Sequence, residues 1–369
     1  MQWFAKDLVP DRRALGAAFT MAFAVAACAQ SAPGTFARMG SLAQAREFQS
    51  AVLLADGRVL IAGGELLTGP SYASAELYDP HIGAFAATGS MTATRTNQAA
   101  VLLPDGDVLV VGGMDDADHA LASAELYGPR SGTFRATGSM NVPRRFPTAT
   151  LLPDGEVLVA GGQDTGDLAS SAELYDPTSG TFRLTGPMTT YRRYAIATLL
   201  PGGQVLIAGG EDYSGKPLGS AELFDPTSGA FVTTGSMTEA RAAHTATLLL
   251  DGHVLLVGGF DDSYADLASA ELYDPKARTF VATGSMSVER SSGTATLLKN
   301  GQVLLAGGAA DTRCELYNPK TARFLPTGSL GTERWEATAT LLQDGRVLVA
   351  GGAAFDQDRT IDSAELYTP

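Results

Sequence analysis

Between residues 34 and 369, hydrophobic residues fall in short clusters that recur in the same order seven times. Each repeat contains a run of consecutive apolar residues that ends in a Gly-Gly pair, such as the run 347–350 before Gly351. Consecutive rather than alternating apolar positions indicate a strand that is buried on both faces. The pairs recur every 44 to 49 residues and begin at Gly63, Gly112, Gly161, Gly209, Gly258, Gly307 and Gly351.

Each repeat also contains the signals of three further strands. An Ala/Thr-rich segment (148–152 in the third repeat) precedes the apolar run, and a dipeptide such as Asp154-Gly155 separates the two. Such dipeptides favour a two-residue hairpin turn with positive φ. A "SAELYDP" segment and a "TFRATGSM" segment follow the glycines. We therefore expect four strands per repeat, in the order a, b, c and d.

The ends of the chain predict how the repeats close into a ring. A d-type segment at 34–42 precedes any a, b or c segment, and the last repeat (331–369) has a, b and c but no d. Pairing these two ends completes one repeat and leaves no open sheet edge between the first and last blades. The sequence predicts an all-β fold: one seven-bladed β-propeller over 34–369, with four-stranded blades and the last blade closed by the N-terminal strand.

The repeats resemble the Kelch repeat along the whole of residues 34–369. The resemblance rests on the double glycine after an apolar strand, the Tyr-Asp-Pro of strand c, the aromatic residue of strand d and the "Gly-Ser-Met…Arg" segment. Phe stands in strand d where the family often has Trp, and Phe224 replaces the strand c tyrosine. The resemblance implies a binding scaffold more often than an enzyme, although galactose oxidase is a catalytic relative on this fold.

Two charged positions recur in every repeat. A catalytic group is needed once rather than seven times, so we interpret both as structural rings of buried, mutually paired charges. The alternative is a basic funnel that recognises a carboxylate or an acidic peptide. The ring residues are Arg46, Arg95, Arg144, Arg192, Arg241, Arg290 and Arg334, with Glu76, Glu125, Glu173, Glu222, Glu271, Glu315 and Glu365.

Ligand contacts are expected where the repeats differ, in the b–c and d–a loops on one face of the ring. The residues after each ring arginine vary and include aromatic side chains suited to a sugar or a peptide. An alternative is that Phe48, Phe146 and Tyr194 only fill gaps between blades. The candidate ligand-binding residues are Arg145, Phe146, Arg193, Tyr194, His244, Trp335 and Glu336.

The charge balance narrows the class of partner. The formal net charge is −14, and the b–c loops carry most of it. Nucleic acid is therefore excluded as a partner, and we expect a monomer that binds a protein or a glycan. Calcium in the acidic loops is an alternative to a solvated rim, but no calcium-loop motif is present, so neither a metal nor another cofactor is expected.

Residues 1–33 resemble an export signal. Basic residues precede an uncharged run over 14–28 that is too short to span a bilayer. The run ends at Cys28 in a pattern similar to a bacterial lipoprotein signal, and cleavage after Ala29 is nearly as good. We expect an exported protein that is periplasmic, outer-membrane-anchored through a lipid on Cys28, or secreted. Cys314, the other cysteine, is interpreted as a small core residue.

Enzymatic alternatives have weak support in the sequence. A copper site of the galactose oxidase kind needs two converging histidines and two tyrosines, and three of the four histidines are expected far from the axis. A sugar-acid mutarotase, as in periplasmic sialic-acid enzymes that resemble this fold, could use Arg145, Arg193, Glu336 and His244. We expect a non-catalytic binding scaffold, with this isomerase as the alternative.

Overall fold

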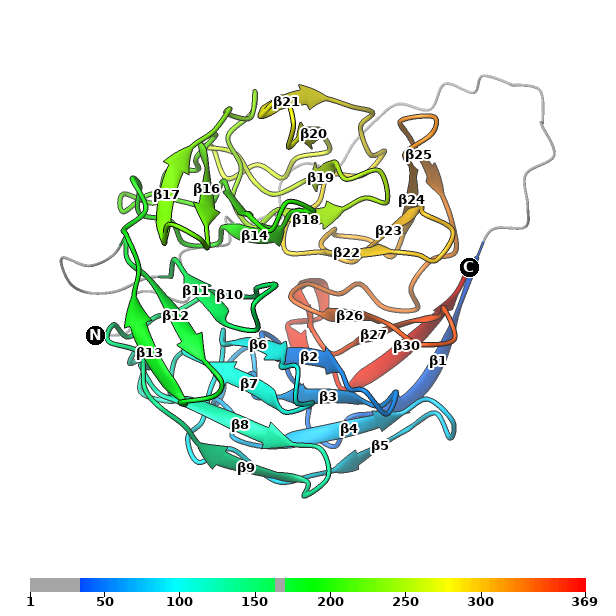
Figure 1. Ribbon diagram of the computed structural model, residues 1–369. Coiled ribbons are helices and arrows are strands. Elements are labelled where there is room, and N and C mark those ends of the chain that lie inside the picture. Colours follow the sequence, from blue (N-terminus) through cyan, green and yellow to red (C-terminus); the bar gives the residue numbers. More distant parts are fainter. Residues whose placement is uncertain (1–33, 163–169) are drawn as a thin grey trace. The chain divides into compact units, whose positions relative to one another are not determined.

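The computed structural model describes residues 34–162 and 170–369, and residues 34–369 form one compact unit. The export prediction for residues 1–33, including Cys28, therefore lies outside the described residues. Seven four-stranded antiparallel sheets are arranged around a central axis (Figure 1). The predicted all-β, seven-bladed β-propeller is confirmed.

Each blade contributes one strand to each of four concentric positions. The innermost strands (a) are β2 (Ser50–Leu53), β6 (Ala99–Leu102), β10 (Thr148–Leu151), β14 (Ile196–Leu199), β18 (Thr245–Leu248), β22 (Thr294–Leu297) and β26 (Thr338–Leu341). The second strands (b) are β3 (Val59–Ala62), β7 (Val108–Val111), β11 (Val157–Ala160), β15 (Val205–Ala208), β19 (Val254–Val257), β23 (Val303–Ala306) and β27 (Val347–Ala350).

The outer half of each blade is formed by strands c and d. The c strands are β4 (Ala75–Asp79), β8 (Ala124–Gly128), β12 (Ala172–Asp176), β16 (Ala221–Asp225), β20 (Ala270–Asp274), β24 (Glu315–Asn318) and β30 (Ser363–Thr368). The d strands are β5 (Ala84–Ala87), β9 (Thr133–Ala136), β13 (Thr181–Leu184), β17 (Ala230–Thr233), β21 (Thr279–Ala282), β25 (Arg323–Pro326) and β1 (Thr35–Ser41).

The two ends of the described chain close the ring. Strand β1 pairs antiparallel with β30, with Phe36 opposite Tyr367 and Arg38 opposite Glu365. The last sheet therefore has the order β1-β30-β27-β26, and the innermost strands of blades 7 and 1, β26 and β2, are neighbours. Figure 1 shows the blue β1 lying beside the red β30. The predicted pairing of 34–42 with the end of the last repeat is confirmed.

The a–b turns differ from the predicted two-residue hairpins. In blade 1 the connection between β2 and β3 spans 54–58, and the Leu54 amide donates to the Arg58 carbonyl at 2.8 Å. Only Gly57 of the Asp-Gly dipeptide has a positive φ, 88°. Asp56 instead accepts a hydrogen bond from the Arg58 amide through its side chain at 3.0 Å. An aspartate that bonds the backbone two residues on stabilises this longer turn, and this explains why Asp recurs here.

The hydrophobic core lies between adjacent blades. Every b strand is fully buried, as its consecutive apolar residues predict. One cluster joins Leu158 and Leu174 of blade 3 to Val205, Ile207 and Phe224 of blade 4, and equivalent clusters recur around the ring. The packing of each sheet, through both of its faces, against the neighbouring sheets is therefore the main source of stability.

A tyrosine–threonine hydrogen bond links most adjacent blades on their outer side. The hydroxyls of Thr88 and Tyr127 lie 2.8 Å apart, and equivalent pairs join four further blade interfaces. In blade 1, Met39 occupies the threonine position of the preceding d strand, and the buried Tyr78 hydroxyl has no hydrogen-bond partner. The first d segment thus lacks the threonine hydroxyl that the tyrosine of the next blade bonds at five other interfaces.

This difference predicts opposite effects for two equivalent substitutions. Tyr78→Phe removes an unpartnered buried hydroxyl and is expected to leave the free energy of unfolding unchanged or raise it. Tyr127→Phe breaks a hydrogen bond and leaves Thr88 without it, and is expected to cost about 1 kcal/mol. Urea unfolding of the two variants measures both values. Equal losses would show that Tyr78 has a partner in solution.

Candidate binding site on the loop face

The antiparallel strands divide the connections between two faces of the ring. The b–c and d–a connections lie on one face, which we call the loop face, and the a–b and c–d turns lie on the other, the turn face. The residues of the innermost strands are half-buried, except for the buried Thr247 and Thr296, as expected for strands that border the axis. The variable loops and the start of each innermost strand therefore meet on the loop face.

The ring arginines are buried and bind within their own blades. Arg192 is fully buried; its Nη2 lies 3.2 Å from the Glu222 carboxylate, and its Nη1 donates to the Gly209 and Ser220 carbonyls at 3.0 and 2.8 Å. Burial lowers the pKa of Arg192, and attraction to Glu222 opposes this shift. Equivalent ion pairs occur in all seven blades at 3.0 to 3.6 Å. Each buried ring arginine is thus paired with a glutamate of its own blade, so the arginines do not form an open basic funnel.

The double glycines connect each blade to the next. In blade 1 the Gly64 amide donates to the Arg95 carbonyl of blade 2 at 2.8 Å, and in blade 7 the Gly352 amide donates to the Arg46 carbonyl at 2.8 Å. A Cβ at Gly63 would lie 2.5 Å from the Arg95 carbonyl oxygen, and φ there is +68°. Only glycine fits this approach, which fixes the d–a loop that follows each ring arginine.

The second residue after every ring arginine has a left-handed backbone. All seven have φ between 49° and 57°, although none is glycine. Left-handed φ is uncommon for such residues, and the surrounding ring must hold them there. They precede the innermost strands at the loop face, and we call them the mouth ring: Phe48, Asn97, Phe146, Tyr194, Ala243, Ser292 and Glu336.

Side chains of the mouth ring converge from different blades. Phe146 of blade 3 contacts Phe48 of blade 1, with ring centroids 6.4 Å apart, and Tyr194 of blade 4, at 4.3 Å. Backbone hydrogen bonds also run around the ring, for example from the Phe146 amide to the Asn97 carbonyl at 3.2 Å. The aromatic residues thus contact one another near the axis. The sequence alone did not decide between this arrangement and one in which they fill gaps between blades.

The other side of the mouth ring is acidic. Burial raises the pKa of the half-buried Glu336 to about 7, and a hydrogen bond with Ser292 opposes this shift. Burial also raises the pKa of Glu47 to about 8, and repulsion from Glu336 and Glu65 adds to the shift. Glu47 is 2% exposed, and its Oε2 has no hydrogen-bond partner. Glu336 of the mouth ring and the buried Glu47 therefore lie within electrostatic range of each other.

The raised pKa of Glu47 predicts a loss of stability at high pH. Between pH 4.5 and about 8, the folded protein keeps a proton on Glu47 that the unfolded chain releases, so stability falls as pH rises through this window. The slope is about 1.4 kcal/mol per pH unit for one group. The Glu47→Gln side chain cannot ionise. Between pH 5 and pH 8 the free energy of unfolding of the wild type is therefore expected to fall by about 2–4 kcal/mol more than that of Glu47→Gln. Urea unfolding at both pH values tests this, and Asp262→Asn, an exposed carboxyl group on the same face, is the control. The same change in both variants would contradict this assignment.

Two of the predicted site residues are engaged with neighbouring loops. The Arg193 guanidinium forms an ion pair with Glu211 and lies over the Tyr194 ring at 5.6 Å, while Arg145 donates to the Asp118 carbonyl. These are the arginines that the isomerase alternative would use for a substrate carboxylate, and both already have partners in the chain.

Trp335 and His244 are both buried. Trp335 is 5% exposed and packs against Phe355 in η1 (Phe355–Gln357), within the hairpin of β28 (Ala353–Ala354) and β29 (Arg359–Thr360). His244 is 3% exposed, and burial lowers its pKa to about 3. Neither imidazole nitrogen has a hydrogen-bond partner. The structure gives both residues a packing role, and their contact with a ligand stays a prediction.

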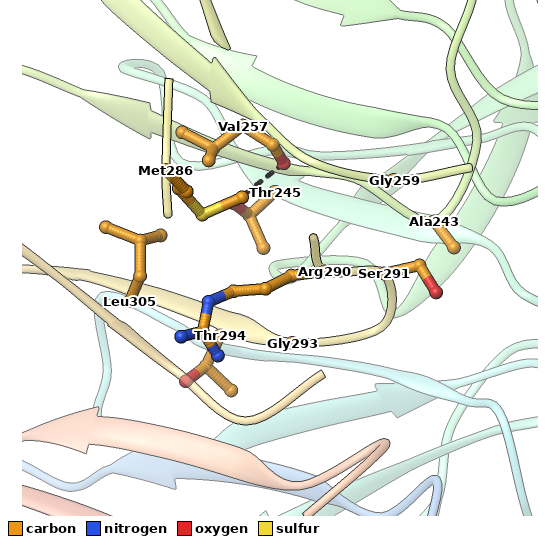
Figure 2. A pocket seen from close by; sticks show the side chains of 10 residues that line it. All are labelled: Ala243, Thr245, Val257, Gly259, Met286, Arg290, Ser291, Gly293, Thr294 and Leu305. Carbon is orange, nitrogen blue, oxygen red and sulfur yellow. Dashed lines mark hydrogen bonds between the residues drawn. The ribbon is translucent and has the colours of Figure 1, made fainter. Parts of the chain in front are cut away.

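A small cavity lies between blades 5 and 6 (Figure 2). It borders Gly293, whose equivalents in blades 1 and 2 are Gln49 and Gln98; these glutamines fill the corresponding space and donate to backbone carbonyls. The space within the cavity is about 10 Å³, enough for roughly one water molecule. It is a packing defect rather than a ligand site.

An aromatic cluster on the loops of blades 4 and 5 was not predicted from the sequence. Tyr191 and Tyr213 make an edge contact at 5.7 Å, and Phe260 stacks on Tyr264 at 5.4 Å. The Tyr264 hydroxyl donates to the Gly215 carbonyl of the neighbouring blade at 3.3 Å. Tyr213 is 76% exposed. We call Tyr191, Tyr213, Phe260 and Tyr264 the aromatic cluster; the tyrosines in the b–c loops were its signal.

Acidic residues of the b–c loops largely stabilise their own loops. Asp115, Asp212 and Asp261 occupy equivalent positions, and each accepts two hydrogen bonds from backbone amides two and four residues ahead. In 34–162 and 170–369, no group of three or more His, Cys, Asp or Glu residues is arranged to hold a metal ion. The histidines that copper would need lie apart: His81 and His253 are in turns on the turn face, and His119 is in an outer loop. The residues present do not fit a copper centre.

Two remaining observations concern Cys314 and the membrane. Cys314 is 1% exposed in the core between blades 6 and 7, and burial raises the pKa of its thiol to about 11. It is therefore a core residue and a poor nucleophile at neutral pH. The described part of the chain contains no helix that is long and apolar enough to cross a membrane.

Comparisons with known proteins agree with this architecture. The family model of the Kelch motif matches residues 144–189, which run from the ring arginine of blade 3 to the next d–a loop. A solved structure of a fungal alcohol oxidase of the AA5 family, in complex with copper, is similar with a TM-score of 0.75 and 18% identity over 91% of this chain and 76% of that one. At this identity the likeness shows the fold alone. No curated protein sequence matches the chain.

These results define the class as a seven-bladed β-propeller that contains a Kelch motif. The resemblance to Kelch repeats is confirmed, and propellers of this kind are commonly binding scaffolds.

Proposed function

We propose that this propeller is a non-catalytic scaffold that binds a protein or glycan partner through its loop face. The aromatic cluster is the observation that carries the proposal. Its tyrosines belong to two blades, and Tyr213 and Tyr264 expose 76% and 36% of their surfaces. Tyrosine and arginine are enriched among the residues that dominate binding energy at interfaces. Arg193, two residues after Tyr191 in the chain, adds a guanidinium to the same sector.

The contrast with the turn face supports this choice of face. Large apolar side chains exposed there, such as Ile82 and Leu250, belong to turns of different blades. Scattered apolar residues are normal for any protein surface, whereas clustered aromatic residues mark binding sites. The loop face therefore offers the better surface for a partner.

Site-specific photocrosslinking in cells that express the protein tests the proposal. A photoreactive phenylalanine analogue at Tyr213 is expected to give discrete crosslinked products. The same analogue at Ile82, which is 74% exposed on the turn face, is the matched control and is expected to give none. Products that carry peptide or carbohydrate distinguish the two classes of partner. Equal labelling at both positions, or none at Tyr213, would refute binding through this sector.

Export belongs to the same proposal, since the predicted partner would lie outside the cytoplasm. It rests on residues 1–33 alone, with Cys28 as the candidate for lipidation. Fractionation of cells with metabolic labelling by radioactive palmitate tests it. Label that disappears in Cys28→Ser supports the lipid anchor; an exported but unlabelled protein supports cleavage after Ala29. Recovery of the intact chain in the cytoplasm would contradict export.

A further inference from the structure

We propose that the mouth ring binds a cationic side chain of a protein partner, a lysine ammonium or an arginine guanidinium, between its aromatic residues and Glu336. This inference rests on the proposed function and specifies the chemistry of the partner. It concerns residues at the axis, whereas the aromatic cluster lies in the outer loops of blades 4 and 5.

The aromatic side supplies faces that attract cations. Phe146 contacts both Phe48 and Tyr194, so three rings from blades 1, 3 and 4 form a continuous surface. The negative face of an aromatic ring attracts an ammonium or guanidinium group, by about 0.5–1 kcal/mol at exposed sites and more where water is excluded. All three rings are half-buried, which favours the stronger end of this range.

The acidic side supplies the countercharge. Glu336 belongs to the mouth ring, where its amide donates to the Ser292 carbonyl at 3.1 Å, and it lies within electrostatic range of Tyr194 and Glu47, residues of blades 4 and 1. Glu47 is 98% buried, since only 2% of it is exposed, and its Oε2 lacks a hydrogen-bond partner. A buried carboxyl oxygen without a hydrogen-bond partner is costly, and a cation placed beside Glu336 and Glu47 would supply a donor and favour the ionised form of both groups.

The neighbouring arginines of the chain already have partners. Arg193 pairs with Glu211 and lies over the Tyr194 ring at 5.6 Å, and Arg145 donates to the Asp118 carbonyl. Contact with a partner's cation is therefore assigned mainly to the Phe48 and Phe146 rings. The formal charge of −14, most of which the b–c loops carry, also attracts a basic partner over a longer range.

Binding of short blocked peptides to the purified propeller tests the proposal. The probe is acetyl-Gly-Lys-Gly-amide, and acetyl-Gly-norleucine-Gly-amide is its neutral analogue of similar shape. Aromatic NMR signals of Phe48, Phe146 and Tyr194 report contact with the mouth ring. The lysine peptide is expected to shift these signals at millimolar concentration and to bind about tenfold more tightly than the norleucine peptide.

Three variants separate specific from general attraction. Glu336→Gln is expected to weaken lysine-peptide binding about tenfold. Phe146→Leu keeps an apolar side chain but removes the ring, and is expected to weaken it several-fold. Asp262→Asn removes the same charge from an exposed site on the loop face and is expected to have less than about a twofold effect.

The outcomes distinguish this inference from the proposed function. Equal binding of both peptides, equal effects of Glu336→Gln and Asp262→Asn, no shift at 10 mM peptide (roughly the weakest affinity worth measuring), or preferential binding of a neutral oligosaccharide would each overturn it. If Tyr213 still gives crosslinks in that case, the scaffold function stands and only the cationic site is wrong. Loss of crosslinks at Tyr213 defeats the proposed function whatever the peptides show.

Discussion

Arg192→Met is expected to destabilise the propeller by about 3–5 kcal/mol, because it leaves a buried carboxylate without its countercharge. Arg192 and Glu222 are both 0% exposed, and the arginine also donates to two backbone carbonyls. Glu222 would retain one hydrogen bond, from the Thr189 amide at 2.7 Å. Chemical unfolding in urea at pH 7 measures the loss.

Two further variants make this prediction specific. Arg183→Met breaks the exposed ion pair between Arg183 and Glu156 on the turn face, and is expected to cost less than about 1 kcal/mol. Arg192→Met combined with Glu222→Leu removes both buried charges, and is expected to recover part of the stability lost in Arg192→Met. An Arg192→Met variant no less stable than Arg183→Met would show that the ring pairs are not structural.

Removal of strand β1 is expected to have an equally large effect. A chain that begins after Leu42 would lose the pairing with β30, the contact of Phe36 with Tyr367 at 4.9 Å, and the burial of Leu42, which is 3% exposed. Together these losses amount to about 5 kcal/mol, which is comparable with the whole stability of many domains. The free edge of β30 would also favour aggregation. Thermal unfolding and light scattering measure both effects.

A chain that begins at Gly34 is the matched control for this truncation. It retains every strand pairing of the ring and is expected to unfold in one cooperative transition at the wild-type temperature. If the two truncated chains have the same stability, β1 does not contribute to the last blade in solution.

The fold could be predicted because the same pattern of apolar, turn and aromatic positions recurs in every repeat. The runs before Gly63 and Gly351 are apolar at consecutive positions, and this pattern has few solutions other than stacked sheets. The position of the first d segment then determined the closure. Recurrence also identified the ring arginines and glutamates as structural, because a buried charge that occurs in every blade needs an oppositely charged partner in every blade.

The candidate site could be predicted only in part. The residues after each ring arginine vary as expected, but the direction of each side chain depends on a left-handed backbone that non-glycine residues such as Phe146 and Glu336 do not signal. Trp335 is one of the candidate ligand-binding residues, yet it is buried against Phe355 in the short hairpin of β28 and β29, whose two-residue strands leave no periodic pattern in the sequence. The aromatic cluster combines residues from different loops, and only the folded ring brings them together.

Hydrogen exchange at the closing strand tests the central claim most directly, because every site described above depends on a closed seven-bladed ring. Mass spectrometry of the native protein can compare residues 34–42 with the equivalent outer strands β5 and β9. We predict that the 34–42 segment exchanges as slowly as those two strands. Complete exchange of 34–42 within seconds, while β5 and β9 remain protected, would show that the ring is open and would contradict the account.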